Sequence, residues 1–354
     1  MNNFFCIICI IVFLFKTETV LSNNLIYDVN NIEVSGKINN NLDNKKLIED
    51  AFKKAFIIFV NKTLLTEDAT NLYRTEINTI KDLIFSYQIV ENEINKKKII
   101  LIVNVKFDQK KINNFLSQKK ISYADISNIS LTLLPILIKE TEVFMYTDNF
   151  FYNNWIPKKE DNEPLKDNLI KYNMALENIE DLQYINTNKE NLEIINVKKI
   201  NSLKNKNNYV FLIIYSVEDK FQAYIKTFIG NKEINKNVTL KISTKNEIKS
   251  YEKAIPLIKK EISQIWKKQN LIDVNISSYL DFFLEIKQIN DYLKLRSVLD
   301  SIDVIENYSM LELTSEYAKI RIKYNGKITK IKNKFLEKKI NVQIKNNIWS
   351  LRIN

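Results

Sequence analysis

Only three glycines and four prolines occur among the 354 residues of this chain. Glycine supplies the positive φ angles of tight turns and ligand-cradling loops, and proline interrupts helices and strands. A chain with so few of either is expected to consist mostly of regular helices and strands. The same scarcity excludes the glycine-rich phosphate-binding and dinucleotide-binding fingerprints. The 45% apolar and 27% charged content is typical of a globular protein, and the length suffices for two or three domains.

The N-terminus carries an apolar run, FFCIICIIVFLF, from Phe4 to Phe15. Such a run is too short to cross a bilayer, for which about 20 residues are needed. Val20 and Ser22 occupy the −3 and −1 positions of a small-residue cleavage site, so residues 1–22 are predicted to be a signal peptide. We therefore expect an exported protein with no transmembrane segment after cleavage. The opening MNN has no Lys or Arg, and an uncleaved inner-membrane anchor is the alternative.

Both cysteines, Cys6 and Cys9, lie inside this run, and the chain has no histidine. Cleavage would leave no disulfide, no thiol nucleophile, no imidazole base and no Cys or His metal site. We accordingly expect no cofactor and no metal, and we expect that the protein is not an enzyme.

The net charge of +11 has two interpretations. The positive charge could favour binding to nucleic acid or to an anionic membrane surface. It could also reflect lysines spread over every solvated face. No RNA-binding or zinc-finger spacing accompanies the short Lys clusters. We expect no nucleic-acid partner, and a basic peripheral protein on anionic lipid stays an alternative.

Hydrophobic periodicity predicts an α+β fold of three small domains in series. Residues 25–120 predict a strand, an amphipathic helix capped by Asp43, a short helix over 71–80, a hairpin, and a helix capped by Asp108. Residues 276–354 show the order β-α-β-β-α-β, which is typical of a ferredoxin-like domain, and end in a hairpin.

Residues 128–271 predict a central α/β domain with a mixed sheet and flanking helices. The apolar run 129–138 is typical of a strand buried on both faces, and 209–217 and 221–229 are strong strand signals. A helix is compatible with 190–203. A long helix over 247–269 places Ile248 and six other apolar residues on one side, and Pro256 implies a kink or a later start.

An aromatic segment, MYTDNFFYNNW, follows the buried strand and contains Tyr146, Phe150, Phe151, Tyr152 and Trp155. These residues keep neither the strand period nor the helix period. An aperiodic aromatic loop either packs over the edge of its sheet or lines a cleft that binds a peptide or glycan. Both interpretations stay open, and the five residues are candidate binding residues.

Three acids in ENIED, namely Glu177, Glu180 and Asp181, form the second candidate site. Carboxylates at this spacing could face one solvent pocket and act as acid and base, or grip a cation. Acids at a helix start also complement its dipole. The cluster motivates a carboxylate-dependent hydrolase of an envelope glycan as an alternative function.

Several segments together resemble a bacterial periplasmic family, the domain-of-unknown-function family 2066. The matching residues are VSGKINNNLDNKKLIEDAFKKAFIIFVNKTL, the strand end Val105 to Asp108, LLPIL at Leu133 to Leu137, Trp155, MALENIEDL at Met174 to Leu182, and IWKKQN. They cover most of residues 30–270. Val60-Asn61-Lys62 stands where the family has Val-Thr-Gly, and Met174 stands where it has Pro. The resemblance implies a periplasmic location, and it implies no catalytic residue.

The expected function is therefore that of a non-catalytic binding or scaffold protein in envelope maintenance. Its partner would be an envelope protein or a peptidoglycan-associated component, bound through sheet edges and a loop-lined cleft.

Overall fold

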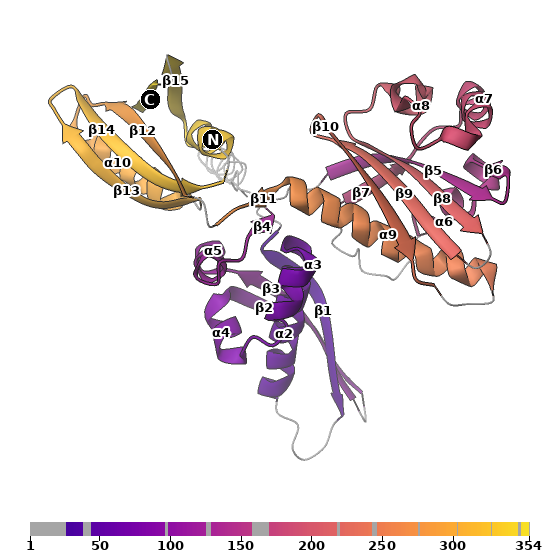
Figure 1. Ribbon diagram of the computed structural model, residues 1–354. Helices are drawn as coiled ribbons and strands as arrows, with labels where there is room; N and C mark the ends of the chain where they lie inside the picture. Colours follow the sequence, from indigo (N-terminus) through magenta and orange to yellow (C-terminus); the bar gives the residue numbers. More distant parts are fainter. Residues whose placement is uncertain are drawn as a thin grey trace, which may run out of the picture.

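The computed structural model describes residues 26–37, 44–95, 98–124, 129–157, 170–217, 220–242, 246–274, 277–302, 304–326, 328–345 and 348–353. The predicted signal peptide, its two cysteines and the predicted cap Asp43 lie outside these residues. Figure 1 shows three lobes that meet near two short strands, β4 (Tyr123–Ala124) and β11 (Leu271–Ile272). The fold is α+β and has several small domains, as the sequence predicts.

The first domain places helices against one face of a three-stranded antiparallel sheet of order β1-β3-β2. Its elements are β1 (Asp28–Lys37), α2 (Asn44–Thr63), α3 (Thr66–Leu72), α4 (Ile77–Leu83), β2 (Ile84–Asn95), β3 (Lys98–Phe107) and α5 (Gln109–Gln118). The single helix predicted over 71–80 is wrong, because the chain turns at 73–76 and separates α3 from α4. The predicted cap of α5 is confirmed, since Asp108 Oδ1 accepts from the Lys111 backbone N–H at 3.0 Å.

Strand β2 is one of the two edges of this sheet and carries exposed apolar side chains. Phe85 and Val90 lie at two irregularities in the pairing with β3, and they are 69% and 53% exposed. Tyr87 packs edge-on against Phe52 of α2, with ring centroids 5.0 Å apart. Bulges of this kind interrupt regular pairing and re-aim side chains, so β2 presents apolar groups along an irregular edge.

The central domain is built on a mixed sheet of order β10-β9-β8-β5-β6, with β7 also paired to β5. Its strands are β5 (Ile129–Lys139), β6 (Glu142–Phe144), β7 (Ile170–Met174), β8 (Tyr209–Val217), β9 (Lys220–Ile229) and β10 (Lys232–Leu240). β5 runs parallel to β7 and β8, and eight consecutive residues, 131–138, are buried. The prediction of a strand buried on both faces is confirmed, since separate apolar clusters lie on its two sides.

Helices and short turns cover both faces of that sheet. They are η1 (Tyr146–Asp148), α6 (Phe150–Asn154), α7 (Ile179–Thr187), η2 (Lys189–Asn191), η3 (Val197–Lys199), α8 (Asn201–Lys204) and α9 (Glu247–Gln269). The helix predicted over 190–203 is wrong, because two 3₁₀ turns and one short helix replace it. α9 has the predicted bounds and continues through the exposed Pro256. Ile248 lies on its solvent side, 58% exposed, and not in the predicted apolar stripe.

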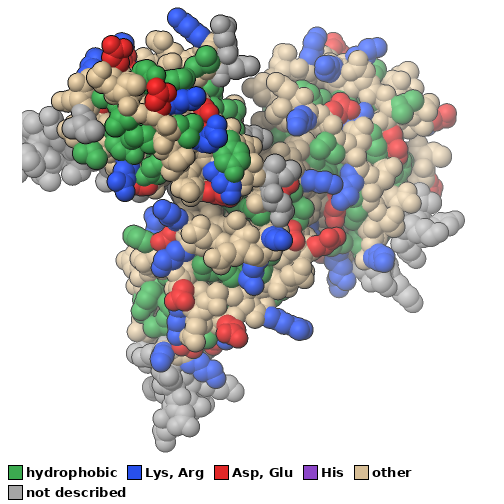
Figure 2. Space-filling view, turned by 60° about the vertical axis from the view of Figure 1, so that its left-hand side comes forward, with side chains coloured by type: hydrophobic (Ala, Val, Ile, Leu, Met, Phe, Trp, Pro, Cys, Tyr) green, Lys and Arg blue, Asp and Glu red, His purple; other side chains and the backbone are tan. Residues whose placement is uncertain are grey.

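The third domain has a five-stranded sheet of order β13-β14-β12-β16-β15. Its elements are β12 (Ser277–Glu285), α10 (Ile289–Ser301), β13 (Ile305–Leu313), β14 (Tyr317–Asn325), α11 (Ile328–Glu337), β15 (Ile340–Lys345) and β16 (Ile348–Ile353). A ferredoxin-like order would place a single antiparallel last strand beside β12. Here the final hairpin inserts β16 beside β12 in parallel, and β15 becomes the edge. Figure 2 shows hydrophobic, basic and acidic side chains interspersed over this domain at the upper left.

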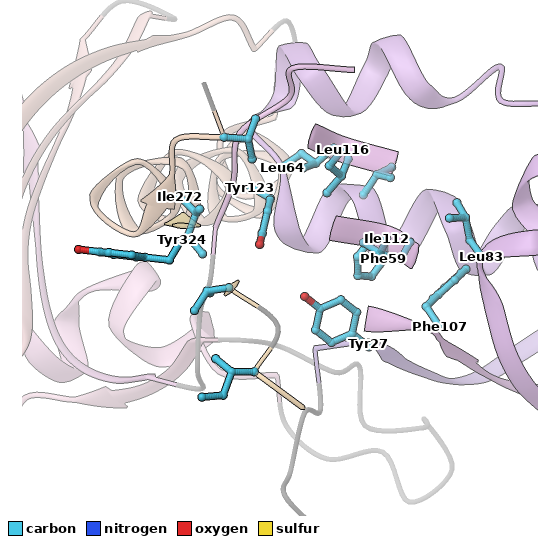
Figure 3. Packing of buried hydrophobic residues seen from close by; sticks show 14 of the residues in the cluster. Tyr27, Phe59, Leu64, Leu83, Phe107, Ile112, Leu116, Tyr123, Ile272 and Tyr324 are labelled. Atoms are coloured by element: carbon cyan, nitrogen blue, oxygen red, sulfur yellow. The ribbon is translucent and has the colours of Figure 1, made fainter. Parts of the chain in front are cut away.

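The domains meet around the β4–β11 ribbon, in which Ile272 pairs with Tyr123. One buried apolar cluster extends from the first domain through these two residues into the third (Figure 3). Gly326, at φ +89°, lies so close to Ile272 that a Cβ atom would stand 3.2 Å from its Cγ1. The first and third domains therefore share a continuous core.

Scarce glycine has a visible effect on the backbone. Among the residues that the structure describes, Asn31, Lys120, Glu140, Tyr146, Asn231 and Lys339 adopt positive φ. Asn tolerates this conformation, but a bulky residue there is an outlier. Tyr146 opens the aromatic segment, so its strain must be offset by packing.

Candidate functional site

The aromatic segment forms part of the central core. Phe151 and Trp155 are fully buried, Tyr146 is 6% exposed, and Phe150 and Tyr152 are half-buried. The segment folds into η1 and α6 because Asn149 fixes it. The Asn149 side-chain amide, 0% exposed, donates to the Pro135 and Phe144 carbonyls at 3.0 Å each, and its Oδ1 accepts from the Phe151 N–H at 2.8 Å.

Ring contacts tie this segment to α9 and to strand β7. Phe150 and Phe151 lie 5.3 and 5.1 Å from the Tyr251 ring, and Trp155 meets Tyr172 edge-on at 5.6 Å. Lys259 Nζ donates to the Trp155 carbonyl at 2.6 Å, and burial lowers the pKa of this lysine. The five rings thus anchor the segment, and they do not form an exposed binding surface.

Tyr146 and Tyr152 lie together, on the other face of the central sheet. Their rings meet edge-on at 5.7 Å, and the Tyr152 hydroxyl donates to the Ala175 carbonyl at 2.8 Å. Burial, with the nearby charge of Asp181, raises the pKa of Tyr146 to about 12. Tyr146 is therefore a neutral packing residue at physiological pH.

The three predicted acids do not converge on a pocket. Glu177 and Glu180 are exposed, whereas Asp181 is 1% exposed. Asp181 Oδ1 accepts from the Asn201 N–H at 2.6 Å, and Oδ2 accepts from the Ser202 N–H at 2.9 Å. This carboxylate satisfies the first backbone donors of α8, which have no partner within the helix. Asp181 therefore links α7 to α8, and both of its carboxylate oxygens are engaged in these structural hydrogen bonds.

A cleft of about 750 Å³ lies between the first and third domains, where the sequence predicted no site. One wall is the polar side of α5, which contributes Gln109, Asn114 and Gln118. Phe85, on the edge strand β2, also lines this cleft. The wall is positioned by Tyr27, whose hydroxyl donates to Asn113 Oδ1 at 3.1 Å and whose carbonyl accepts from the Phe107 N–H.

The opposite wall comes from the end of α10 and from strands β13 and β14. Glu306 Oε2 pairs with Lys323 Nζ at 2.6 Å, and its Oε1 accepts from Asn325 Nδ2 at 2.5 Å. Burial raises the pKa of Glu306, but the hydrogen bonds from Lys323 and Asn325 outweigh it and leave the pKa below its usual range. Glu306 is thus ionised at neutral pH and held in place.

The carboxylates of the cleft are committed to structural contacts. Asp108 caps α5, Asp300 Oδ1 accepts from the Tyr308 hydroxyl at 3.0 Å, and Glu306 bonds Lys323 and Asn325. A general acid needs a proton at working pH, which an ionised, paired Glu306 lacks. Within the described ranges, no cluster of three or more His, Cys, Asp or Glu could hold a metal ion. The cleft presents amides, one aromatic ring and balanced charges.

Sequence reasoning missed this cleft because its walls come from segments almost 200 residues apart. The acid in VIENYSMLEL was a visible signal, since Glu306 interrupts an apolar strand start. Its partners depend on the register of β13 against β14, which the sequence does not reveal.

No protein-family model and no curated protein matches the chain. The resemblance to family 2066 accordingly stays a prediction. Among the residues that can be described, no helix is both long and apolar enough to span a membrane.

Proposed function

We propose that the protein is an exported, non-catalytic binding or scaffold protein of the bacterial envelope, whose interdomain cleft holds an extended segment of a partner protein. The observation that carries this proposal is the cleft of about 750 Å³, lined by amide side chains and by carboxylates already engaged. The N-terminal apolar run and the resemblance to a periplasmic family support the compartment.

An extended peptide fits the chemistry of the cleft. Asn114 and Gln118 are exposed on α5, and each amide both donates and accepts hydrogen bonds, as a peptide backbone does. Phe85 is 69% exposed and offers a ring to one apolar side chain of the ligand. Three basic residues (Lys106, Lys110, Lys323) and three acidic ones (Asp108, Asp300, Glu306) line the cleft, so charge selects neither a polyanion nor a polycation.

Site-specific photocrosslinking in the cells that produce the protein tests this proposal. A benzophenone amino acid replaces Asn114 or Phe85, and a matched variant carries it at Ile248. Ile248 is 58% exposed on α9 of the central domain and does not line the cleft. We expect both cleft positions to capture the same envelope protein after irradiation, and Ile248 to capture none.

Equal capture from Ile248, or no capture from either cleft position, would overturn the proposal. Asn114→Trp should obstruct the cleft beside α5 and reduce capture from Phe85 at least fivefold without changing the folded fraction. Cell fractionation tests the compartment separately. A full-length chain with its leader intact in the cytosol would contradict export.

A further inference from the structure

Within the part of the chain that the structure describes, no helix covers one face of the third domain's sheet, where the alternate strand residues are exposed or half-buried. On β12, Leu280, Phe282 and Leu284 point into the core, so the alternate residues lie on the opposite face. On β16, Trp349 and Leu351 are buried, which places Ser350 and Arg352 on that same open face. A groove of about 570 Å³ crosses it over β14, β12, β16 and β15.

Two rows of side chains cross the groove along paired positions. In the first row, Gln343 pairs with Ser350, which pairs with Phe283, which pairs with Lys319. In the second row, Asn341 pairs with Arg352, and Glu285 pairs with Tyr317. Arg352 Nη2 and Glu285 Oε2 lie 2.5 Å apart and join the second row.

Aromatic rings on this face are accessible at intervals suited to a chain ligand. Phe283 and Tyr317 meet edge-on with centroids 5.4 Å apart. Tyr279 lies four residues before Phe283 on β12, about 13 Å away at the rise of a strand, and it is 65% exposed. Lys319 Nζ lies over the Phe283 ring, 5.7 Å from its centroid, and takes up one face of that ring. The Phe283–Tyr317 pair and Tyr279 still offer apolar ring surface at two points along a ligand.

Charges on the open face are balanced by pairing. Arg321 binds Asp281 through two hydrogen bonds of 2.7 and 2.8 Å, Lys323 pairs with Glu306, and Arg352 pairs with Glu285. Lys319 lies over the Phe283 ring, Glu312 accepts from the Tyr317 hydroxyl at 2.8 Å, and Glu316 also lines the groove. Four basic side chains thus stand among five acidic ones (Asp281, Glu285, Glu306, Glu312 and Glu316), so the face has no excess positive charge to attract nucleic acid or anionic lipid.

Neutral hydrogen-bonding groups supply the remaining chemistry. Asn341, Gln343 and Ser350 are exposed at neighbouring cross-strand positions. Amides and hydroxyls both donate and accept, which matches the hydroxyl groups of a sugar. Sugar rings also have apolar C–H faces that pack on aromatic rings. We propose that the open face of the third domain binds an uncharged saccharide chain, in addition to the peptide proposed for the cleft.

Isothermal titration of the full chain with chitotetraose, a neutral oligomer of N-acetylglucosamine, tests this site. We expect saturable binding that Tyr279→Ala weakens at least tenfold and Gln343→Ala at least threefold. Both side chains are exposed, so neither change should alter the fold. Lys204→Ala, at an exposed position in the central domain, is the matched control and should leave the affinity unchanged.

A twenty-nucleotide oligothymidine and vesicles with anionic lipid form the competing arms of the same experiment. Failure of chitotetraose to saturate, or equal binding by the Tyr279→Ala variant, overturns the saccharide site. Salt-sensitive binding of oligothymidine or vesicles that depends on Tyr279 would also overturn it. The crosslinks from Asn114 and Phe85 do not depend on these outcomes, so the two proposals can fail separately.

Discussion

Replacement of Asp181 by alanine distinguishes a structural carboxylate from a catalytic one. The side chain is 1% exposed and accepts from two backbone N–H groups, those of Asn201 and Ser202. A hydrogen bond to a charged group contributes about 1.5–3 kcal/mol. Removal of both acceptors should therefore destabilise the central domain by about 4 kcal/mol, out of a total of about 5–15 kcal/mol for a typical protein.

The isosteric variant Asp181→Asn removes only one of the two acceptor oxygens. Asp181→Asn keeps one oxygen and turns an N–H₂ group towards a backbone N–H, so about 2 kcal/mol should be lost. Glu177→Gln is the matched control on an exposed acid and should change the free energy of unfolding by less than about 0.5 kcal/mol.

Hydrogen exchange followed by mass spectrometry measures the affected amides directly, in peptides that cover residues 196–206. A loss of about 4 kcal/mol corresponds to roughly a thousandfold faster exchange where opening limits it. Urea unfolding supplies a second measurement, with the domains treated as separate transitions. If Asp181→Ala leaves both exchange and unfolding unchanged, the structural assignment is refuted and a chemical role regains support.

Three further changes test other contacts, each by urea unfolding. Gly326→Ala should lower the free energy of unfolding by about 2–3 kcal/mol, because φ is +89° and the new Cβ meets Ile272. Gly230→Ala, with open space around it, should lower it by only about 1 kcal/mol. Equal costs would contradict the close packing at the junction. Asn149→Ala should lower the free energy of unfolding by about 3 kcal/mol, because it leaves the Pro135 and Phe144 carbonyls without this donor. Unchanged stability together with retained near-ultraviolet circular dichroism would contradict this expectation. Burial, with the charge of Lys260 adding to it, lowers the pKa of Lys267 to about 8. The unfolded chain keeps this proton to about pH 10.4, so it binds more protons than the folded chain above pH 8, and stability should rise by about 2 kcal/mol between pH 7.5 and 9.5. Lys267→Met should abolish that rise, and an identical rise in this variant would contradict the assignment.

Local patterns predicted the elements whose signals lie within one segment. The run 129–138 and the long helix α9 were found because burial on both faces, or on one stripe, leaves a periodic trace. Asp108 was found as a cap because its side chain bonds only three residues ahead. The split between α3 and α4 was missed, since no Gly or Pro marks the turn at 73–76 in a chain that makes turns from ordinary residues.

Contacts between distant segments were not predictable in the same way. Asp181 serves α8, twenty residues later, so its neighbours in ENIED gave no sign of its role. The aromatic segment has no single period because a positive φ at Tyr146 and the buried Asn149 divide it into one 3₁₀ turn and one short α-helix. The candidate cleft depends on how three domains meet, which no periodicity encodes.

The contacts at the junction indicate that the cleft is preformed. Lys267, 3% exposed at the end of α9, donates to the Asn61 carbonyl and, at 2.9 Å, to the Leu64 carbonyl at the end of α2. Gln264 accepts from the Thr66 N–H at 3.0 Å, and so fixes the start of α3 to the same helix. Displacement of α9 would leave a buried ammonium and these backbone groups unpaired, which is costly. The shared apolar core of the first and third domains opposes a change in their relative position. A cleft held in this way loses little conformational entropy on binding. A partner segment should therefore be captured without domain closure, and hydrogen exchange at the β4–β11 ribbon, which lies where the domains meet, should be the same with and without it.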